Sequence, residues 1–185
     1  MRIVAGKYRG KALTSPSDDT IRPTSDRARE SIFNILGSRL GPVFDGLRVL
    51  DLFAGTGALG LEALSRGAAH VTFVATAAES RGLIRDHIQA FGVAGITKLL
   101  RRDATALGAP GTFGQFDLIF LDPPYSQGLG EKALAELAAN GWIAPGATIV
   151  WEEFAEADVT IPDGFTLEDT RTYGAAAIRF VTYSA

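Results

Sequence analysis

A carboxylate, two prolines and an aromatic ring stand together at Asp122-Pro123-Pro124-Tyr125, directly after the apolar run Phe116–Leu121. Consecutive prolines cannot continue a sheet ladder, so the chain has to leave the predicted strand at this point. The stiff loop presents oxygen acceptors for both hydrogens of a nucleobase amine, and a ring that can stack on the base. Taken alone, however, these four residues favour the simpler interpretation of a strand end with a proline turn and a half-buried tyrosine.

A glycine-rich turn provides the second group of candidate residues. Gly55, Gly57 and Gly60 have Gly-x-Gly-x-x-Gly spacing between a predicted strand and a predicted helix. In that context, glycines allow a tight turn and close approach of the backbone to an adenosine-bearing cofactor. Asp51, just before the turn, would repel a pyrophosphate, so it suits a cationic amino-acid group or ordered water better.

A third polar group, Asp103, follows the predicted strand Lys98–Arg101. In doubly wound sheets, ligands bind at the carboxyl ends of the strands, so we expect Asp51, Asp103 and Asp122 to face one crevice. Asp103 could accept a hydrogen bond from an adenine amino group, and a role as the cap of the following segment explains it equally well.

The elements that must position these residues alternate between strand and helix. This alternation predicts an α/β fold with a mostly parallel, seven-stranded sheet and helices on both faces. The last two strands flank Tyr173-Gly174 and are expected to form an antiparallel hairpin at the sheet edge. The predicted strands are Arg48–Phe53, His70–Ala75, Lys98–Arg101, Phe116–Leu121, Ala147–Trp151, Thr166–Thr172 and Ala176–Tyr183, and the helices are Thr24–Leu40, capped by Thr24 or Ser25, Ala58–Arg66, Ala77–Phe91 and one that contains Lys132–Ala139.

Composition limits the classes of protein to consider. The chain has 185 residues, 46% of them hydrophobic and 21% charged, with a net charge of -3, so it is not a globally basic nucleic-acid binder. The absence of cysteine excludes disulfides and cysteine-based metal sites, and the separation of His70 from His87 argues against a histidine metal site. We expect no metal, no membrane span and a cytoplasmic location.

The first residues differ in character from the remainder. Residues 1–23 are interpreted as a basic hairpin and loop extension, and residues 24–185 as the main domain. Arg2, Lys7, Arg9 and Lys11 lie in a stretch without acidic residues and could contact the phosphates of structured RNA, although an ordinary solvated hairpin is the alternative. Elsewhere we expect simple surface roles for Arg29, Glu62 and His87, and core roles for Trp142 and Trp151.

Together these residues resemble a class I S-adenosylmethionine-dependent methyltransferase with a Rossmann-like fold. The closer resemblance is to the RsmD-like family, which methylates the N2 amine of a guanine in 16S ribosomal RNA. It rests on the stretches Arg2–Lys11 and Arg22–Glu30, on the glycine turn and on Asp122–Tyr125.

The resemblance implies a role for each group of residues. Asp122 and the carbonyl of Pro123 would hold the target amine, with Pro124 completing the loop and Tyr125 stacking on the base. The partner would be 16S ribosomal RNA or an assembling small ribosomal subunit, and we expect a monomer. S-adenosyl-L-methionine would be bound by Asp51, Phe53, Ala54, Gly55, Thr56, Gly57, Asp103 and Ala104, and RNA by Arg2, Lys7, Arg9, Lys11, Arg22 and Thr24.

One position departs from the pattern of such enzymes. The second strand usually ends in an acidic residue that binds the cofactor's ribose, and Ala75 occupies that position here. Glu79 would substitute only if the turn bent back, and a solvated place in the first turn of the helix is the favoured interpretation. Two alternatives stay open. Asp122–Tyr125 also permits adenine-N6 methylation of DNA or RNA, and Ala75 motivates a non-catalytic RNA-binding protein with a weakened cofactor site. A nicotinamide-dependent dehydrogenase is the least favoured of the alternative functions.

Overall fold

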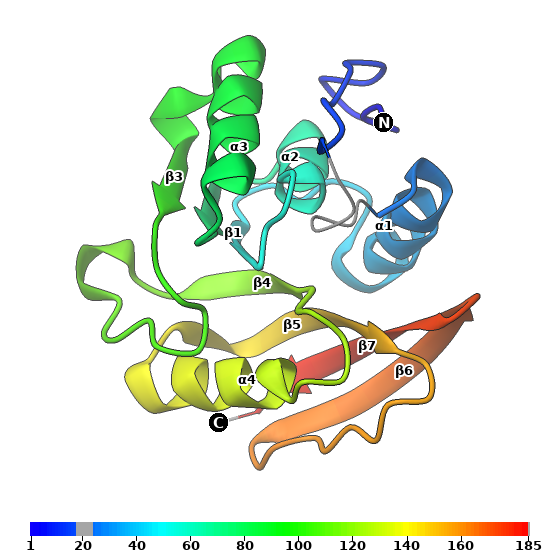
Figure 1. Cartoon of the computed structure of the whole chain (residues 1–185), viewed down its shortest axis with the longest axis vertical. Coiled ribbons are helices and arrows are strands. Elements are labelled where there is room, and N and C mark those ends of the chain that lie inside the picture. The colour runs from blue at the N-terminus through cyan, green and yellow to red at the C-terminus, as the bar shows by residue number, and fades with distance from the viewer. Residues whose placement is uncertain (18–23, 185) are drawn as a thin grey trace.

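A computed structural model of the chain describes residues 1–17 and 24–184. These residues form a seven-stranded sheet in the order β3-β2-β1-β4-β5-β7-β6, with helices on both faces (Figure 1). The strands are β1 (Arg48–Leu52), β2 (His70–Val74), β3 (Thr97–Leu100), β4 (Phe116–Leu121), β5 (Ile143–Phe154), β6 (Phe165–Tyr173) and β7 (Ala176–Tyr183), and the α-helices are α1 (Asp26–Leu40), α2 (Ala58–Ser65), α3 (Ala78–Phe91) and α4 (Leu129–Asn140).

The first five strands are parallel, and their register brings the predicted site segments to one edge. Leu52 of β1 is paired with both Val74 of β2 and Leu121 of β4, and Val74 is paired with Leu100 of β3. The residues that follow these four positions therefore leave the sheet side by side. This confirms the predicted α/β fold with a mostly parallel sheet.

The C-terminal strands form the expected antiparallel hairpin, in which Tyr173 is paired with Ala176 across a two-residue turn. The hairpin lies at the sheet edge, as predicted, and β7 is the inner of its two strands, between β5 and β6. Burial explains the order, because β7 carries Ile178, Phe180 and Val181, all nearly inaccessible to solvent, whereas most of β6 is exposed. An apolar strand is stable only where both of its faces are covered.

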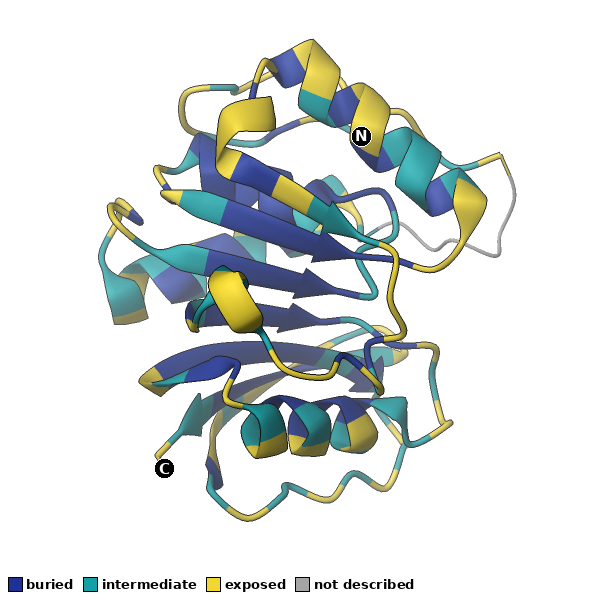
Figure 2. Cartoon of the chain, turned by 90° about the vertical axis from the view of Figure 1, so that its left-hand side faces the viewer, coloured by how far each residue is buried: buried dark blue, intermediate teal, exposed yellow. Residues whose placement is uncertain are grey.

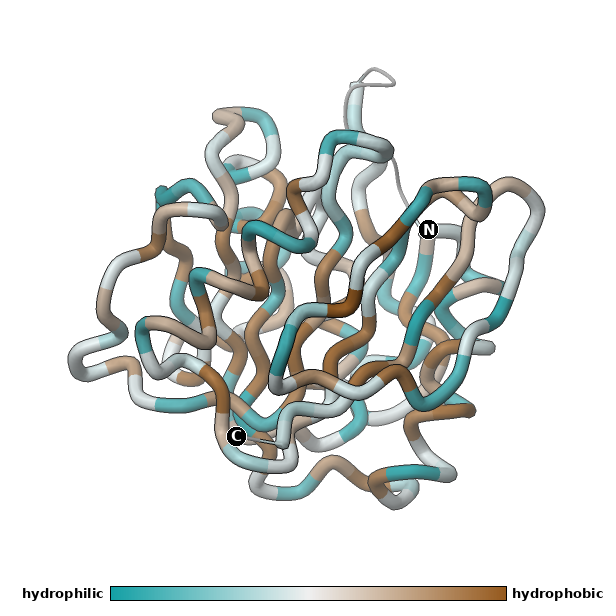
Figure 3. The backbone as a smooth tube through the Cα atoms, turned by 90° about the horizontal axis from the view of Figure 1, so that it is seen from below, coloured by the Kyte–Doolittle hydropathy of each residue, from teal (hydrophilic) through white to brown (hydrophobic). Residues whose placement is uncertain are grey.

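Alternation along each strand divides the core into two layers. Val49, Phe73 and Phe120 pack with α1, α2 and α3 on one face, whereas Leu50 and Val74 pack with α4 on the other. Figure 2 shows the central strands as mostly buried, and Figure 3 shows hydrophobic residues running along the centre of the sheet. Trp142 and Trp151 are fully buried in the α4 layer, as the sequence predicted.

Local signals set the helix ends. Ser25 caps α1, and its hydroxyl accepts a hydrogen bond from the Ala28 N–H at 3.1 Å, which confirms one of the two predicted caps. Helix α3 ends at Gly92, whose φ of 67° lies in the left-handed region that closes helices.

The N-terminal segment is folded against the main domain. Arg2 and Ala12 form an isolated antiparallel bridge, and Ile3 and Leu13 are buried in the core. Gly6 is required here, since its φ is 87° and a Cβ would lie 1.9 Å from the Ser65 carbonyl oxygen.

A buried ion pair fixes this segment. Glu62 accepts hydrogen bonds from the Val4 and Ala5 N–H groups at 2.9 and 3.1 Å and from Arg29 Nε at 3.2 Å. Arg29 and Glu62 are both fully buried, so the prediction of surface roles for them was wrong. The carboxylate lies inside because it satisfies backbone donors that the fold would otherwise bury without partners.

Candidate active site

A cavity of about 640 Å³ opens at the carboxyl ends of β1, β2, β3 and β4. Volumes of this size are typical of small-molecule and cofactor sites. Its lining combines the glycine turn after β1 with the proline loop after β4, which lie far apart in the sequence. The lining residues are Thr24, Asp51, Phe53, Ala54, Gly55, Thr56, Ala58, Leu59, Val74, Ala75, Thr76, Ala77, Ser80, Arg102, Asp103, Ala104, Asp122, Pro123, Pro124, Tyr125 and Leu129.

The turn after β1 has an unusual backbone. Phe53 has a φ of 54° and Gly57 a φ of 80°, so the chain enters the left-handed region before and at the start of α2. A non-glycine residue in that region is disfavoured and persists only where the surroundings hold it. The surroundings include the carbonyl of Val74, which accepts a hydrogen bond from the Ala54 N–H at 3.1 Å.

Helix α3 holds the carbonyl groups of the same turn. The Ser80 hydroxyl donates a hydrogen bond to the Gly55 carbonyl, and Nδ1 of His87 lies 2.9 Å from the Thr56 carbonyl oxygen. His87 is 3% exposed, so the expectation of a solvated histidine was wrong. Burial lowers the pKa of His87, which keeps the ring neutral near pH 7.

Asp51 lies at the floor of the cavity and is 1% exposed. Its Oδ2 accepts a hydrogen bond from the Gly60 N–H at 3.0 Å. Burial raises the pKa of Asp51 to about 8, and the bond from Gly60 opposes that shift. Gly60 is needed for packing, because a Cβ there would lie 2.5 Å from Cε1 of Phe73.

The proline loop contributes both of its candidate side chains, Asp122 and Tyr125, to the cavity lining. Asp122 and Tyr125 are half-buried and Pro123 is buried. The Tyr125 ring is centred 6.1 Å from the Phe154 ring at the end of β5, tilted by 38°. The loop is thus supported from the neighbouring strand.

Glu153 of β5 also supports this loop, and sequence analysis did not single it out. It is 2% exposed, and its Oε1 accepts hydrogen bonds from the Ser126 N–H at 2.9 Å and the Phe154 N–H at 2.7 Å. Alternation along β5 predicts which face of the sheet Glu153 lies on. It does not predict that the carboxylate is buried there.

Asp103 lines the rim in an exposed position. Its Oδ1 accepts hydrogen bonds from the N–H and the hydroxyl of Thr105, and these bonds lower the pKa of Asp103. The described residues 101–115 contain a 3-10 turn, Gly111–Phe113, and no α-helix, so Asp103 caps a local turn. Both of the roles considered from the sequence remain compatible with this position.

Ala75 stands at the position where the sequence analysis expected an acidic ligand of the ribose. Ala75 is buried and lines the cavity, and its N–H donates to the Leu100 carbonyl at 3.1 Å. Glu79 lies outside the lining, and its Oε1 accepts hydrogen bonds from the N–H and hydroxyl of Ser17 at 2.8 and 2.6 Å. The nearest acidic residue of α3 is therefore engaged with the N-terminal segment.

The structure gathers most of the predicted site residues in this cavity. Gly57 lies just behind the lining as the first residue before α2, and Arg22 lies outside the described residues. Ser80, Thr76 and Arg102 are lining residues that the sequence did not single out, since helix and turn periodicity does not reveal which side faces a cavity. The basic residues Arg2, Lys7, Arg9 and Lys11 lie on the N-terminal segment and not in the lining.

Three of these basic residues have intramolecular partners. Lys7 Nζ lies 5.5 Å from the centre of the Tyr8 ring. Arg2 Nη1 donates to the Gly10 carbonyl at 2.7 Å, which closes the segment on itself. Lys11 Nζ lies 5.3 Å from the centre of the Phe91 ring and 3.3 Å from the Ala90 carbonyl oxygen, at the C-terminal end of α3. Lys7 and Arg9 are exposed.

Residues 1–17 and 24–184 contain neither a membrane-spanning helix nor a metal-binding cluster. None of their helices has the length and apolar character that crossing a bilayer requires. They also contain no cluster of three or more histidine, aspartate or glutamate side chains suited to a metal ion.

Comparison with known proteins gives concordant matches. The family model described as conserved hypothetical protein 95 matches residues 1–182. The chain is 38% identical over 182 residues to ribosomal RNA small subunit methyltransferase D of Escherichia coli strain K12, covering 97% of this chain and 88% of that protein. A stretch of 123 residues is 37% identical to the tRNA (guanine(6)-N2)-methyltransferase of Thermus thermophilus, covering 61% of this chain and 36% of that protein.

The fold comparison agrees. A solved structure of a putative methyltransferase from Escherichia coli matches with a TM-score of 0.82 and 34% identity, covering all of this chain and 98% of that one.

Proposed function

The chain belongs to the family described as conserved hypothetical protein 95, which includes ribosomal RNA small subunit methyltransferase D, and from this premise we propose its reaction. The chain is a methyltransferase that transfers a methyl group to the exocyclic N2 amine of a guanine in small-subunit ribosomal RNA. The cofactor is S-adenosyl-L-methionine, and the protein acts as a monomer on 16S ribosomal RNA or on an assembling small subunit.

One observation carries this proposal: the loop Asp122–Tyr125 and the glycine turn line the same cavity. Nothing in folding requires a carboxylate, two proline carbonyls and an aromatic ring beside a cofactor-type turn. The pair of motifs is what a transfer between a bound cofactor and a nucleobase amine demands, because the two reactants must meet in one place.

The residues of the cavity fit the cofactor with one exception. Backbone groups of the turn and the buried carboxyl group of Asp51 suit the amino-acid part, and Asp103 and Ala104 suit the adenine end. The exception is Ala75, where a ribose carboxylate is expected. When bound, S-adenosylmethionine supplies an electrophilic methyl group on a sulfonium.

The residues of the proline loop act on the amine. A guanine amine is a weak nucleophile because its lone pair is delocalised into the ring. Hydrogen bonds from the amine to the Asp122 carboxylate and the Pro123 carbonyl favour a pyramidal nitrogen with its lone pair directed at the methyl group. With the cofactor bound, the nitrogen would gain the methyl group as the methyl–sulfur bond breaks and leaves the thioether, and one proton of the amine would pass to the Asp122 carboxylate. Tyr125 offers its ring to a base that has left its stack.

Guanine N2 is favoured over adenine N6 as the target. Two similarities support this choice: one relative is named for small-subunit ribosomal RNA, and another, a tRNA methyltransferase, is named for guanine N2. The N-terminal basic segment, packed rigidly through the Arg29–Glu62 pair, provides a surface for RNA phosphates.

Methylation of an unmodified small-subunit ribosomal RNA, free and assembled into particles, tests the proposal. The RNA is digested to nucleosides after reaction, and the methylated product is identified by mass spectrometry. We expect N2-methylguanosine, and we expect Asp122→Ala to slow its formation by about 100-fold through loss of alignment. Asp163→Asn, at an exposed position, serves as the matched control.

Two results would contradict the proposal. N6-methyladenosine as the product would establish the adenine alternative. Binding of both RNA and S-adenosylhomocysteine without any transfer would establish a non-catalytic RNA-binding protein.

A further inference from the structure

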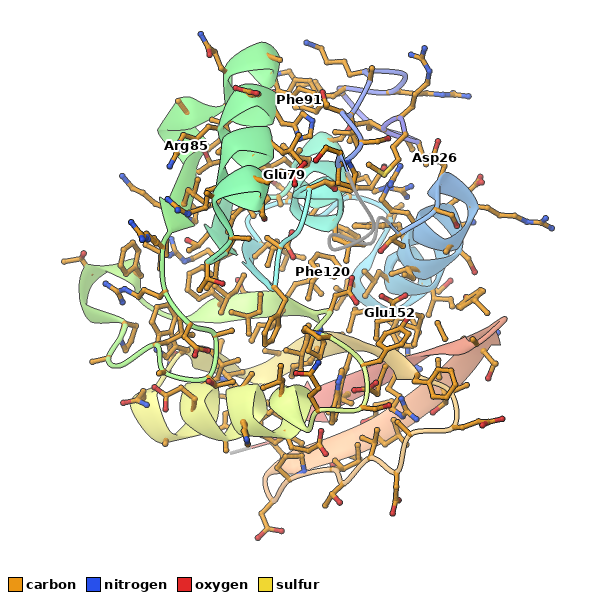
Figure 4. All side chains as sticks on the ribbon, viewed as in Figure 1. Asp26, Glu79, Arg85, Phe91, Phe120 and Glu152 are labelled. Atoms are coloured by element: carbon orange, nitrogen blue, oxygen red, sulfur yellow. The ribbon has the colours of Figure 1, made fainter. Side chains whose placement is uncertain are left out.

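A strap formed by residues 11–17 runs antiparallel along α3. Lys11 Nζ donates to the Ala90 carbonyl at 3.3 Å, the Thr14 N–H donates to His87 Nε2 at 2.8 Å, and Ser17 donates to Glu79. Glu79 and Ala90, the two ends of the contacted stretch, are eleven residues apart, which corresponds to roughly 16 Å along the helix. In Figure 4, Phe91 lies beside the N-terminal segment and Glu79 lies at the opposite end of α3. The strap therefore connects the basic segment with the cofactor end of the helix.

His87 is the residue of α3 that contacts both the strap and the cofactor turn. Since Nε2 accepts the Thr14 N–H, the partners assign the ring proton to Nδ1, which then donates to the Thr56 carbonyl 2.9 Å away. The ring is almost fully buried, and Thr56 is buried and lines the cavity. One neutral imidazole, in one tautomer, thus bridges two segments that are about forty residues apart in the sequence.

The partner atoms on both sides belong to the backbone. The position of Thr14 depends on how the strap lies, and the position of Thr56 depends on the conformation of a turn with several residues at positive φ. A shift of either segment changes a hydrogen bond of the same ring. Because a buried imidazole nitrogen without a partner is costly, the two bonds favour a single joint arrangement of strap and turn.

We propose that His87 is a positioning residue that couples the cofactor turn to the RNA-binding segment. The inference rests on the proposed function, since it assigns RNA to the segment and the cofactor to the turn. Cofactor binding fixes Thr56, His87 then fixes Thr14 and the strap, and the basic residues are held ready for RNA. By thermodynamic linkage, RNA on the segment strengthens cofactor binding by the same factor.

The expected coupling between RNA and cofactor binding is small, because His87 makes only one hydrogen bond to the strap and one to the cofactor turn. Loss of one such bond corresponds to roughly a 2- to 10-fold change in a binding constant. S-adenosylhomocysteine should therefore tighten the binding of an unmodified small-subunit ribosomal RNA transcript by a factor in that range.

Two substitutions of His87 separate its two contacts. An asparagine amide lies near the position of Nδ1 and can still donate to Thr56, whereas a glutamine amide reaches the position of Nε2 and can still accept from Thr14. His87→Asn should keep the affinity for S-adenosylhomocysteine measured without RNA and should lose RNA affinity. His87→Gln should keep RNA affinity and lose affinity for S-adenosylhomocysteine. Both should abolish the coupling, and Gln89→Ala, at an exposed site on the same helix, should retain it.

Three measurements decide the matter: calorimetry with S-adenosylhomocysteine, fluorescence anisotropy with the RNA transcript, and amide hydrogen exchange at Thr14. In the wild type, S-adenosylhomocysteine should slow exchange at Thr14, and in His87→Asn it should not. Equal losses of both affinities in the two variants would show a merely structural role and overturn the proposal, as would unchanged coupling in the variants.

The outcomes also distinguish this inference from the proposed function. If the wild type methylates RNA but binds RNA and S-adenosylhomocysteine independently, the coupling is refuted and the proposed function stands. If the wild type transfers no methyl group, but S-adenosylhomocysteine slows Thr14 exchange only where His87 is intact, the proposed function fails and the link between turn and strap is upheld.

Discussion

The carboxylate of Glu153 accepts a hydrogen bond from the backbone N–H of Ser126 at 2.9 Å and thereby ties the end of β5 to the turn after Tyr125. Ser126 has a φ of 60°, a conformation that a serine adopts only where neighbouring groups hold it. The loop that carries Asp122 is consequently fixed at both ends, by β4 before it and by Glu153 after it.

Glu153→Ala should loosen this loop without changing the cofactor turn on the other side of the cavity. We expect methyl transfer to slow by about 10-fold because the target amine is aligned less well. The affinity for S-adenosylhomocysteine should stay within about 2-fold of the wild-type value, which is a change of less than about 0.5 kcal/mol in the binding free energy. Single-turnover kinetics and calorimetry measure the two effects. Glu152→Gln, at the adjacent position on the other face of β5 (Figure 4), is the control, and an equal loss in both variants would contradict the role given to Glu153.

Ala75→Asp should restore the carboxylate that the ribose position lacks. Ala75 lines the cavity at the end of β2, so a carboxylate there faces the cofactor site. A pair of charge-assisted hydrogen bonds is worth roughly 1.5–3 kcal/mol, which corresponds to about 10- to 100-fold tighter binding of S-adenosylhomocysteine. Calorimetric titration checks this value. An unchanged affinity would mean that other lining residues already hold the ribose.

Asp51 should make stability depend on pH. Its pKa is raised from 3.8 to about 8 in the folded protein, so the folded state holds a proton that the unfolded state has already released. The stabilisation is fully present below the unfolded pKa and is lost as pH rises through the folded pKa. Between these two values the free energy of unfolding should fall by up to about 1.4 kcal/mol per pH unit because of this group.

Asp51→Asn removes the titrating group while keeping an oxygen for the Gly60 N–H. Urea denaturation of both proteins at several pH values measures the difference in their free energies of unfolding. The free energy of unfolding of the variant, relative to that of the wild type, should increase as pH rises to about 8. Parallel pH profiles would show that Asp51 is ionised throughout.

Glu62→Leu should release the N-terminal segment. Glu62 binds Val4, Ala5, Arg29 and Arg66, and its removal leaves the buried Arg29 guanidinium without its fully buried partner. Breaking a buried ion pair in this way costs about 3–5 kcal/mol. Chemical denaturation measures the loss, and faster trypsin cleavage after Lys7, Arg9 or Lys11 reports release of the segment. Glu30→Gln, at an exposed position on α1, is the control, and a cost below about 1 kcal/mol, as for a surface pair, would refute the prediction.

Local sequence properties determined much of this protein. The apolar runs define the central strands, the glycines mark the turn after β1, and the two prolines force the chain out of the sheet beside Asp122. Because parallel strands bring their carboxyl ends to one edge, the alternation of strands and helices was enough to predict a shared site for Asp51, Asp103 and Asp122.

Only the tertiary structure decided the roles of the buried polar residues. Arg29, Glu62, His87 and Glu153 have the composition and spacing of helix or strand surface residues. Each also has a partner far away in the sequence: the pairs His87–Thr14, Arg29–Glu62 and Glu153–Ser126 span 27 to 73 positions, beyond any local pattern. The same holds for β7, whose place inside the sheet depends on which faces its neighbours cover. Local periodicity predicts which side of an element is apolar, whereas the burial of a charge depends on donors and acceptors that only the folded chain brings together.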